Sequence, residues 1–226
     1  MLFDALALFD LRQLQSTAET LVPGQGLRLI QAWHGRLFEY QWLHALAGRY
    51  IDFWSAATDS LSFAARTLGV LLPPDLRAAL LRPLAQPMVW ADAPEALKAL
   101  RSSGLALGIL SNMTGQMLRA GLQNAQLDSL FAHVLSTDQV RSFKPARVAY
   151  QLGLDASGLR REEVLFVAFA GWDAAGATWF GYPTFWLNRN GSTEEELGAK
   201  ALGTGTDLAA LPLFLNIPSR EPAPSG

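Results

Sequence analysis

Up to about residue 90, the apolar residues of the chain recur at helical spacing. One set is separated by three, four or seven residues and therefore shares one face of a helix: Leu29, Trp33, Leu37, Tyr40 and Ala47. The Pro-Gly-Gln-Gly sequence of residues 23–26 predicts a turn between two helices, and further helices are predicted over residues 60–68 and 75–84. The pattern therefore predicts a helical segment over residues 14–89.

Beyond residue 94, short apolar segments alternate with segments of helical spacing. Strands are predicted over residues 105–110, 134–136, 164–170 and 184–187, and helices over residues 117–124, 146–154 and 174–180. Alternation at this length predicts an α/β fold with a doubly wound parallel sheet. Ligands bind at the carboxyl ends of strands in such sheets, and Asp4, Ser111 and Asp173 stand at or just beyond predicted strand ends.

The first nine residues are apolar apart from Asp4, as expected of a buried strand. Together these segments predict an α/β core made of residues 1–13 and 90–226. This core is interrupted after its first strand by a helical cap subdomain of residues 14–89. The last nine residues, 218–226, contain three prolines and are predicted to be a loose end.

Composition narrows the function classes. Half of the residues are hydrophobic and 17% are charged, so the chain can bury a substantial core. A formal net charge of −2 gives no basic excess of the kind that favours nucleic acid or an anionic membrane as partner. The absence of cysteine excludes disulfides and thiolate chemistry, and it fits the cytoplasm. Residues 1–11 lack the basic start of a signal peptide, and no apolar run reaches the roughly 18 residues of a membrane helix.

Four separated patches follow one another between residues 107 and 189. They are Ser111-Asn112, Lys144-Pro145 with Tyr150 behind it, Trp172-Asp173, and the Phe-Gly-Tyr-Pro of residues 180–183. In this order and spacing they resemble the hydrolytic (S)-2-haloacid dehalogenases of the haloacid dehalogenase (HAD) superfamily, and the similarity extends from Phe3 to about Gly191. The resemblance implies a HAD-like core with an inserted cap, a short 2-substituted carboxylate as substrate, no metal or other cofactor, and a homodimer.

The resemblance implies a nucleophilic aspartate at the end of the first strand, which attacks the carbon that bears the halogen before water hydrolyses the enzyme ester. A carboxylate is a weak nucleophile and needs desolvation and a nearby cation. Alignment back from Trp33 places Asp4 at this position, although one residue and the family's Gly-Thr pair are missing between Asp4 and Asp10. The rival placement makes residues 5–9 the strand and Asp10 the reactive group. Neither aspartate has an acid two positions on, where superfamily phosphatases hold magnesium, so a phosphatase is disfavoured.

The resemblance also implies roles for residues that this chain shares with the family. Lys144 implies an ammonium that neutralises the nucleophilic aspartate, and we expect it to form a buried ion pair with Asp173. Ser111 and Asn112 imply contacts with the substrate carboxylate. For three aromatic residues, Phe53, Tyr150 and Trp172, the resemblance implies positions around the substrate. Their apolar character alone is equally compatible with simple packing in the core.

Two further sites depart from the family pattern. The family arginine that follows the tryptophan and helps the halide to leave is replaced by His34. Histidine is cationic only near or below a pKa of about 6.5, so His34 gives pH-dependent help, acts as a general base, or is a polar cap residue. The family's Ser-Ser-Asn is replaced by the Ala-Phe-Ala of residues 168–170, in which Phe169 is expected to narrow or fill the pocket.

Three functions are therefore compatible with the sequence. The first is a metal-independent dehalogenase of small 2-haloacids that works through an Asp4 ester. The second is a hydrolase of another C–X bond, for example in a small cyclic amino acid, in which His34 protonates an amine leaving group. The third is a binding homologue that keeps the fold without turnover. A pocket blocked by Phe169 would favour this third function.

Overall fold

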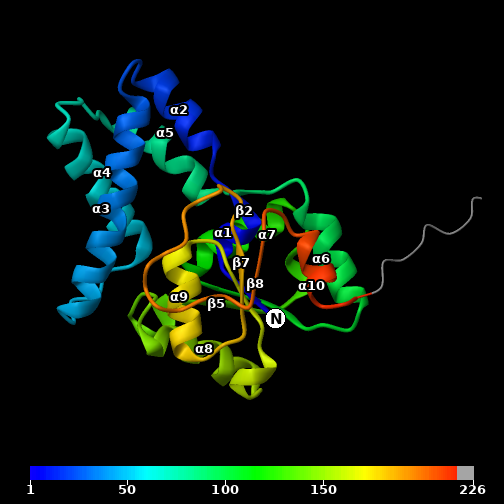
Figure 1. The fold of residues 1–226 in the computed structure, drawn as a ribbon. Coiled ribbons are helices and arrows are strands. Elements are labelled where there is room, and N and C mark those ends of the chain that lie inside the picture. Colours follow the sequence, from blue (N-terminus) through cyan, green and yellow to red (C-terminus); the bar gives the residue numbers. More distant parts are fainter. Residues whose placement is uncertain (218–226) are drawn as a thin grey trace, which may run out of the picture.

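The computed structural model of the protein describes residues 1–217. The prediction of a loose end for residues 218–226 lies outside the described residues. The described chain forms a parallel sheet covered by helices, and a separate group of helices, α2 to α5, lies to one side of it (Figure 1).

The sheet has the strand order β5-β4-β1-β6-β7-β8, and all neighbouring strands are parallel. Its strands are β1 (Leu2–Phe3), β4 (Leu107–Ser111), β5 (Phe131–Ser136), β6 (Phe166–Ala168), β7 (Thr184–Leu187) and β8 (Gly203–Gly205). β1 lies inside the sheet, where Phe3 is paired with Ile109 on one side and with Val167 on the other. The predicted α/β parallel sheet is confirmed, although a two-residue central strand is shorter than usual.

Helices cover the sheet and follow the predicted alternation with the strands (Figure 1). They are α6 (Ala93–Ser102), α7 (Gly115–Asn124), α8 (Arg147–Ser157), α9 (Gly171–Phe180) and the short α10 (Ala210–Phe214). Single 3-10 turns lie at Asp128–Leu130, Thr137–Val140 and Arg161–Glu163. The sequence pattern does not predict α6, α10 or β8. The Gly-Thr-Gly of β8 has no apolar side chain that would signal a strand.

The segment after β1 differs from both placements of the first strand. Of the strand predicted over residues 1–9, only residues 2–3 and residue 9 are in strands. Between them lies α1 (Ala5–Leu8), a single helical turn. β2 (Phe9–Asp10) then pairs antiparallel with β3 (Met88–Val89). The rival prediction of a strand over residues 5–9 is therefore wrong for residues 5–8. The Asp4 carboxylate accepts a hydrogen bond from the Leu6 N–H at 3.0 Å and caps the turn, and alanine and leucine are strong helix formers.

Four helices connect β2 to β3: α2 (Gln13–Leu21), α3 (Gly26–Leu46), α4 (Phe53–Thr67) and α5 (Pro74–Ala85). Of the five residues predicted to share one face of α3, three are buried: Leu29, Trp33 and Leu37. Gln41 continues this buried face in place of Tyr40, and Ala47 lies exposed beyond the helix end. Within residues 1–217 we find no helix with the length and hydropathy needed to cross a membrane.

Buried side chains pack against both faces of the sheet. Phe3 belongs to a large cluster that continues into helices α2 to α5. Leu2 belongs to a second cluster with Tyr150 and Phe166. Because neighbouring residues of β1 are packed on opposite faces, the strand is held from both sides up to Asp4.

Candidate active site

Three charged side chains from separate elements meet at the carboxyl end of the sheet. Asp4 follows β1, Lys144 lies between the turn Thr137–Val140 and α8, and Asp173 lies in the first turn of α9. The Lys144 Nζ lies 2.9 Å from Asp4 Oδ1 and 2.9 Å from Asp173 Oδ2. Lys144 and Asp173 are buried, whereas 14% of the Asp4 side chain is exposed. One ammonium therefore joins two carboxylates that lie far apart in the sequence.

The charges in this cluster depend on one another. Burial raises the pKa of Asp173 to about 6, although the attraction of Lys144 opposes the rise. Burial alone would lower the pKa of the Lys144 ammonium, but attraction to Asp173 and Asp4 outweighs burial and raises that pKa. The Tyr150 hydroxyl donates a 2.6 Å hydrogen bond to Asp173 Oδ1, and burial raises the pKa of Tyr150. Lys144 therefore stays charged at neutral pH, and Tyr150 stays a hydrogen-bond donor.

Asn112 connects the strand end to the cap. Its side-chain oxygen accepts a 2.8 Å hydrogen bond from the Lys144 backbone N–H, and its side-chain nitrogen donates to Gln41 Oε1 of α3 at 2.8 Å. The neighbouring Ser111 Oγ accepts a hydrogen bond from the Met113 N–H at 3.2 Å. Gln41 is fully buried, and the sequence analysis did not predict it as part of the site. Its position four residues after Leu37, on an apolar helix face, is a signal of a buried polar side chain that needs a hydrogen-bond partner.

A cavity of about 100 Å³ opens beside Asp4, between the strand ends and the cap helices. Eight of the ten residues predicted for the site line it: Asp4, His34, Phe53, Ser111, Asn112, Lys144, Trp172 and Asp173. The polar groups come mainly from the strand ends, and most of the remaining wall is apolar. The Trp172 ring packs edge-on against Phe38 and Trp42 of α3 and closes one side. The arrangement offers a carboxylate to a molecule held in mostly hydrocarbon surroundings.

His34 lies on α3 at the edge of this cavity. The residue is exposed on one side, while its ring contacts Phe38 edge-on with the ring centres 4.9 Å apart. Partial burial of the ring lowers the pKa of His34 below its ordinary value of 6.5. His34 is therefore mostly neutral at pH 7.

The other two predicted site residues lie outside the cavity. Tyr150 is buried behind Asp173, so it contacts that carboxylate rather than a bound molecule. Phe169 borders a neighbouring hollow that also contains Asn188 and Glu195, and its backbone carbonyl accepts a hydrogen bond from Trp186 Nε1 at 3.0 Å. The expectation that Phe169 narrows or fills the pocket is therefore wrong, because the cavity wall at this point is Ala170.

Asp10 lies away from the cluster. Its carboxylate forms a salt bridge with Arg12 at 2.7 Å, and it does not line the cavity. A side-chain hydrogen bond from Arg12 lowers the pKa of Asp10. Of the two aspartates considered from the sequence, Asp4 is the one in contact with Lys144.

Two residues absent from the sequence predictions hold the turn that follows Asp4. The Trp90 Nε1 donates to the Leu6 carbonyl at 3.1 Å, and the Trp90 N–H donates to the Leu8 carbonyl at 2.9 Å. The Ala7 carbonyl, which lies between those of Leu6 and Leu8 in the sequence, accepts hydrogen bonds from Arg189 Nε and Nη2 at 3.3 and 3.2 Å. Every carbonyl from residue 6 to residue 8 therefore has a donor supplied from outside the turn, and no local sequence signal marks these donors.

Loss of the Arg189 guanidinium should destabilise the fold. Its side chain is 5% exposed, forms a 3.0 Å salt bridge with Asp92 and stacks over the Trp90 ring. We expect Arg189→Met to lower the free energy of unfolding by about 2–3 kcal/mol, because Asp92 loses its paired cation and the Ala7 carbonyl loses its donor. Urea denaturation of both proteins measures the change.

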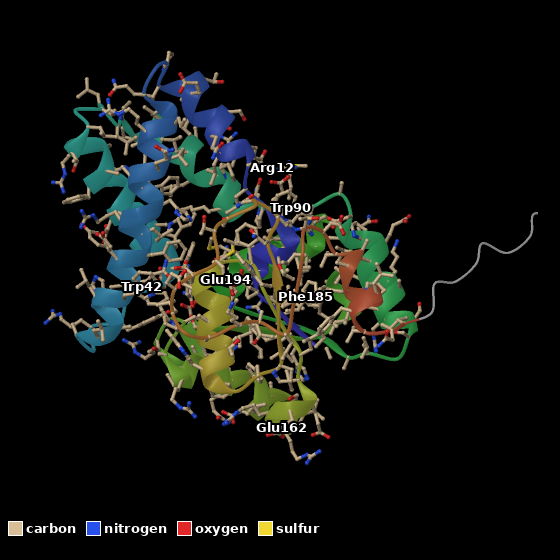
Figure 2. The ribbon with its side chains drawn as sticks, in the orientation of Figure 1. Arg12, Trp42, Trp90, Glu162, Phe185 and Glu194 are labelled. Atoms are coloured by element: carbon tan, nitrogen blue, oxygen red, sulfur yellow. The ribbon has the colours of Figure 1, made fainter. Side chains whose placement is uncertain are left out.

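The matched control is Arg12→Met. Arg12 lies over the same Trp90 ring, close to it in Figure 2, but its side chain is 71% exposed and touches no carbonyl of the turn. We expect a clearly smaller loss of stability from this variant. Equal losses in the two variants would show that stacking on Trp90, rather than the carbonyl and Asp92 contacts, carries the effect.

The described residues contain no cluster of side chains that could coordinate a metal ion. Within residues 1–217, no three histidine, aspartate or glutamate side chains lie close enough together to hold a metal ion. The position two residues after Asp4 is Leu6, which supplies no oxygen ligand.

A family model for haloacid dehalogenase-like hydrolases matches residues 12–181 of the chain. The (S)-2-haloacid dehalogenase of Pseudomonas sp. (strain YL) is 38% identical over 191 residues, which span 84% of this chain and 82% of that protein. Its similarity therefore covers most of both chains.

Solved structures agree with the sequence similarity. The crystal structure of an L-2-haloacid dehalogenase superposes with a TM-score of 0.93 at 39% identity, covering 95% of this chain and 97% of the other. The L-2-haloacid dehalogenase from Xanthobacter autotrophicus with chloropropionic acid covalently bound superposes with a TM-score of 0.87 at 30% identity, covering 96% and 98%. From the matched model and these extended similarities, we conclude that the chain belongs to the haloacid dehalogenase-like hydrolases.

Proposed function

We propose that this protein is an (S)-2-haloacid dehalogenase that works through an ester of Asp4 and needs no metal ion. One observation carries the proposal: the Asp4 carboxylate lies at the polar end of a mostly apolar cavity, with the buried Lys144 ammonium 2.9 Å away. The names of the related proteins, and the chloropropionic acid bound covalently in one of them, support the same reaction.

In the first step, a carboxylate oxygen of Asp4 attacks C2 of the substrate. A C–O bond forms while the C–halogen bond breaks, and the halide leaves with the bonding electrons. Asp4 Oδ1 is held by Lys144 and Oδ2 by the Leu6 N–H, so the carboxylate has a fixed orientation. Burial in the cavity removes water from the nucleophile, which favours displacement.

In the second step, water attacks the carbonyl carbon of the ester. The bond from this carbon to the ester oxygen that is attached to C2 then breaks. This step releases a 2-hydroxy acid and a proton, and it restores the Asp4 carboxylate with an oxygen from water. The Lys144 ammonium lies beside the oxygen on which negative charge develops and stabilises it. Over both steps, one water is consumed for each halide released.

The alternative functions receive less support. An amine leaving group needs a proton, but His34 is mostly neutral at pH 7 because its pKa is lowered. A silent site blocked by Phe169 is also disfavoured, because Phe169 lies outside the cavity. The neutral His34 nevertheless leaves the departing halide without the cation that the family resemblance implies.

Chloride release from L-2-chloropropionate, measured together with the intact mass of the protein, tests the proposed function. We expect the purified protein to release chloride and His34→Arg to release it about tenfold or more faster, because a permanent cation then faces the leaving group. His34→Gln is the matched neutral control and should stay near the unaltered protein at pH 7. The proposal is contradicted if none of the three proteins releases chloride or forms an ester adduct.

We further propose that residues 14–89 act as a cap domain over a core of residues 1–13 and 90–226. All four helices of the cap segment contribute to the cavity wall, so this segment controls what reaches Asp4. The homodimer implied by the resemblance and the cytoplasmic location inferred from composition stay predictions.

A further inference from the structure

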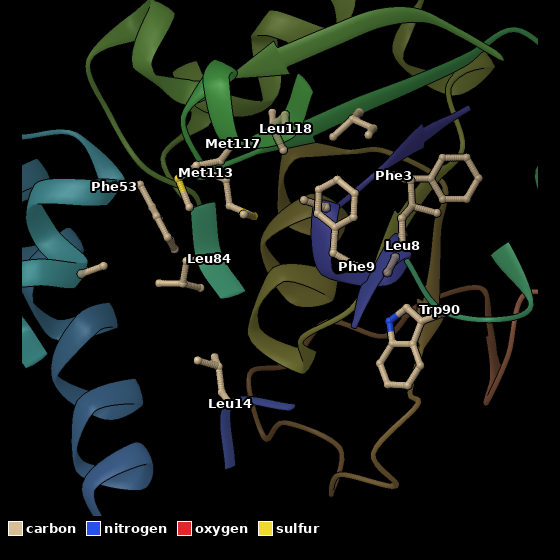
Figure 3. Close-up of a cluster of buried hydrophobic side chains, with 14 of the residues drawn as sticks. Phe3, Leu8, Phe9, Leu14, Phe53, Leu84, Trp90, Met113, Met117 and Leu118 are labelled. Carbon is tan, nitrogen blue, oxygen red and sulfur yellow. The ribbon is translucent and has the colours of Figure 1, made fainter. Parts of the chain in front are cut away.

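The cavity beside Asp4 extends well into the cap. Its wall on the cap side is formed by Leu14 of α2, Ile30 of α3 and Leu84 of α5, with Phe53 of α4 beside them. Figure 3 shows Phe53, Leu84 and Leu14 along the boundary between the cap helices and the core. The two reaction steps use none of these side chains.

The cap side of the cavity offers hydrocarbon to a bound molecule. Apart from His34, the charged and hydrogen-bonding aliphatic side chains that line the cavity belong to the strand ends, their loops and the first turn of α9. A carboxylate in contact with Leu14, Ile30 and Leu84 would lose its hydration without gaining a hydrogen bond. The carboxylate and halogen of a substrate must therefore stay beside Asp4, and the alkyl group on C2 is the part that can enter the cap.

The size of the cavity exceeds that of a three-carbon substrate. A buried water needs about 10–15 Å³ of such space, so about 100 Å³ corresponds to roughly seven to ten groups of that size. 2-Chloropropionate has six non-hydrogen atoms, whereas 2-chlorohexanoate has nine. A short substrate leaves the cap side of the cavity unfilled.

We propose that the protein is selective for 2-halo acids with an unbranched chain of about four to seven carbons, whose alkyl end lies between Leu14, Ile30 and Leu84. This inference rests on the proposed function and deepens it by naming the substrate class. Each methylene buried against these side chains raises kcat/KM up to about fourfold until the cavity is full.

A homologous series of racemic 2-chloroalkanoates from three to eight carbons tests the proposal. We expect kcat/KM for chloride release to rise about tenfold or more from 2-chloropropionate to 2-chlorohexanoate and to fall again at eight carbons. A profile that is flat or highest at three carbons overturns the inference.

Leu14→Trp should remove this selectivity by filling the cap side of the cavity. We expect the ratio of kcat/KM for 2-chlorohexanoate to kcat/KM for 2-chloropropionate to fall about tenfold or more. Leu21→Trp is the matched control, because Leu21 lies on the same helix but is exposed and does not line the cavity. If Leu14→Trp does not fold, Ile30→Phe fills the same region with a smaller addition. Equal losses for short and long substrates in the folded variant contradict the proposal.

Binding of unhalogenated acids separates this inference from the proposed function. We expect hexanoate to bind at least about tenfold more tightly than propionate by isothermal titration calorimetry, and Leu14→Trp to abolish this difference. If no chloride is released but the binding difference is present, the proposed function fails, and of the inference only the binding of an alkyl chain by the cap side of the cavity stands. If chloride is released without any chain-length preference in rate or binding, the inference fails and the proposed function stands.

Discussion

Asp4→Asn is expected to abolish chloride release from L-2-chloropropionate, with a fall of at least about 1000-fold in kcat. An amide oxygen is a poor nucleophile, so no ester forms and the intact mass stays unchanged. Asn has nearly the same shape as Asp and still accepts the Lys144 hydrogen bond that Asp4 Oδ1 accepts at 2.9 Å. The loss therefore reports on the charge and reactivity of the carboxylate rather than on packing.

Asp10→Asn is the matched control, because it makes the same change six residues further on. Asp10 pairs with Arg12 and does not line the cavity, so we expect kcat to stay within about twofold. Retained activity in Asp4→Asn with lost activity in Asp10→Asn would assign the nucleophile to Asp10 instead. Loss in both variants would require the ester to be located by peptide mass spectrometry.

Lys144→Met is expected to cause the greatest loss of stability among single changes at the site. The substitution leaves the carboxylates of Asp4 and Asp173 without the ammonium that lies 2.9 Å from each. Removing one partner of a buried ion pair costs about 3–5 kcal/mol, and we expect a loss of this size in the free energy of unfolding at pH 8. Chloride release should fall at least about 100-fold in the same variant.

The loss in Lys144→Met should depend on pH in a defined direction. Burial already raises the pKa of Asp173 to about 6, and removal of Lys144 takes away an interaction that opposes this rise. A carboxyl whose pKa is higher in the folded than in the unfolded protein favours folding at low pH, and this contribution is lost as pH rises through the folded pKa. The difference from the unaltered protein should therefore be smallest near pH 5 and grow towards pH 8.

Urea denaturation at several values between pH 5 and pH 8 measures this dependence. Lys98→Met, at an exposed position of α6, is the control for the removal of one lysine charge and should change stability little at any pH in this range. A loss in Lys144→Met that is equal at pH 5 and pH 8 would mean that packing of the lysine stem, rather than its charge, stabilises the site.

Much of the fold and part of the site can be predicted from local patterns in the chain. Apolar segments of strand length that alternate with helical segments predict the parallel sheet, which the structure contains. Ser111 and Asp173 follow such segments, and strand ends in parallel sheets meet at one edge, so their shared location follows from the pattern. The resemblance adds Lys144, which no periodicity marks as special.

Contacts across the fold favour Asp4 over Asp10 as the nucleophile that we propose. Both aspartates follow apolar residues, but Lys144, 140 positions away, reaches Asp4. Residues 5–8 are all apolar, so they show no alternation of apolar and polar residues that would distinguish a strand from a helical turn. Their helical form depends on the Asp4 cap and on donors from Trp90 and Arg189. These donors come from distant segments, and local sequence does not record which segment will supply them.

The same reason explains the other differences. Phe169 was expected in the pocket because it belongs to the segment that replaces the family's Ser-Ser-Asn, yet the hollow it borders is a neighbouring one. Gln41 lies on a helix face that is otherwise apolar, and its partner Asn112 is 71 residues away. Periodicity along the chain encodes which residues are buried, because burial follows from one face of one element. Which buried groups meet depends on how the elements pack together, and that is a property of the folded chain as a whole.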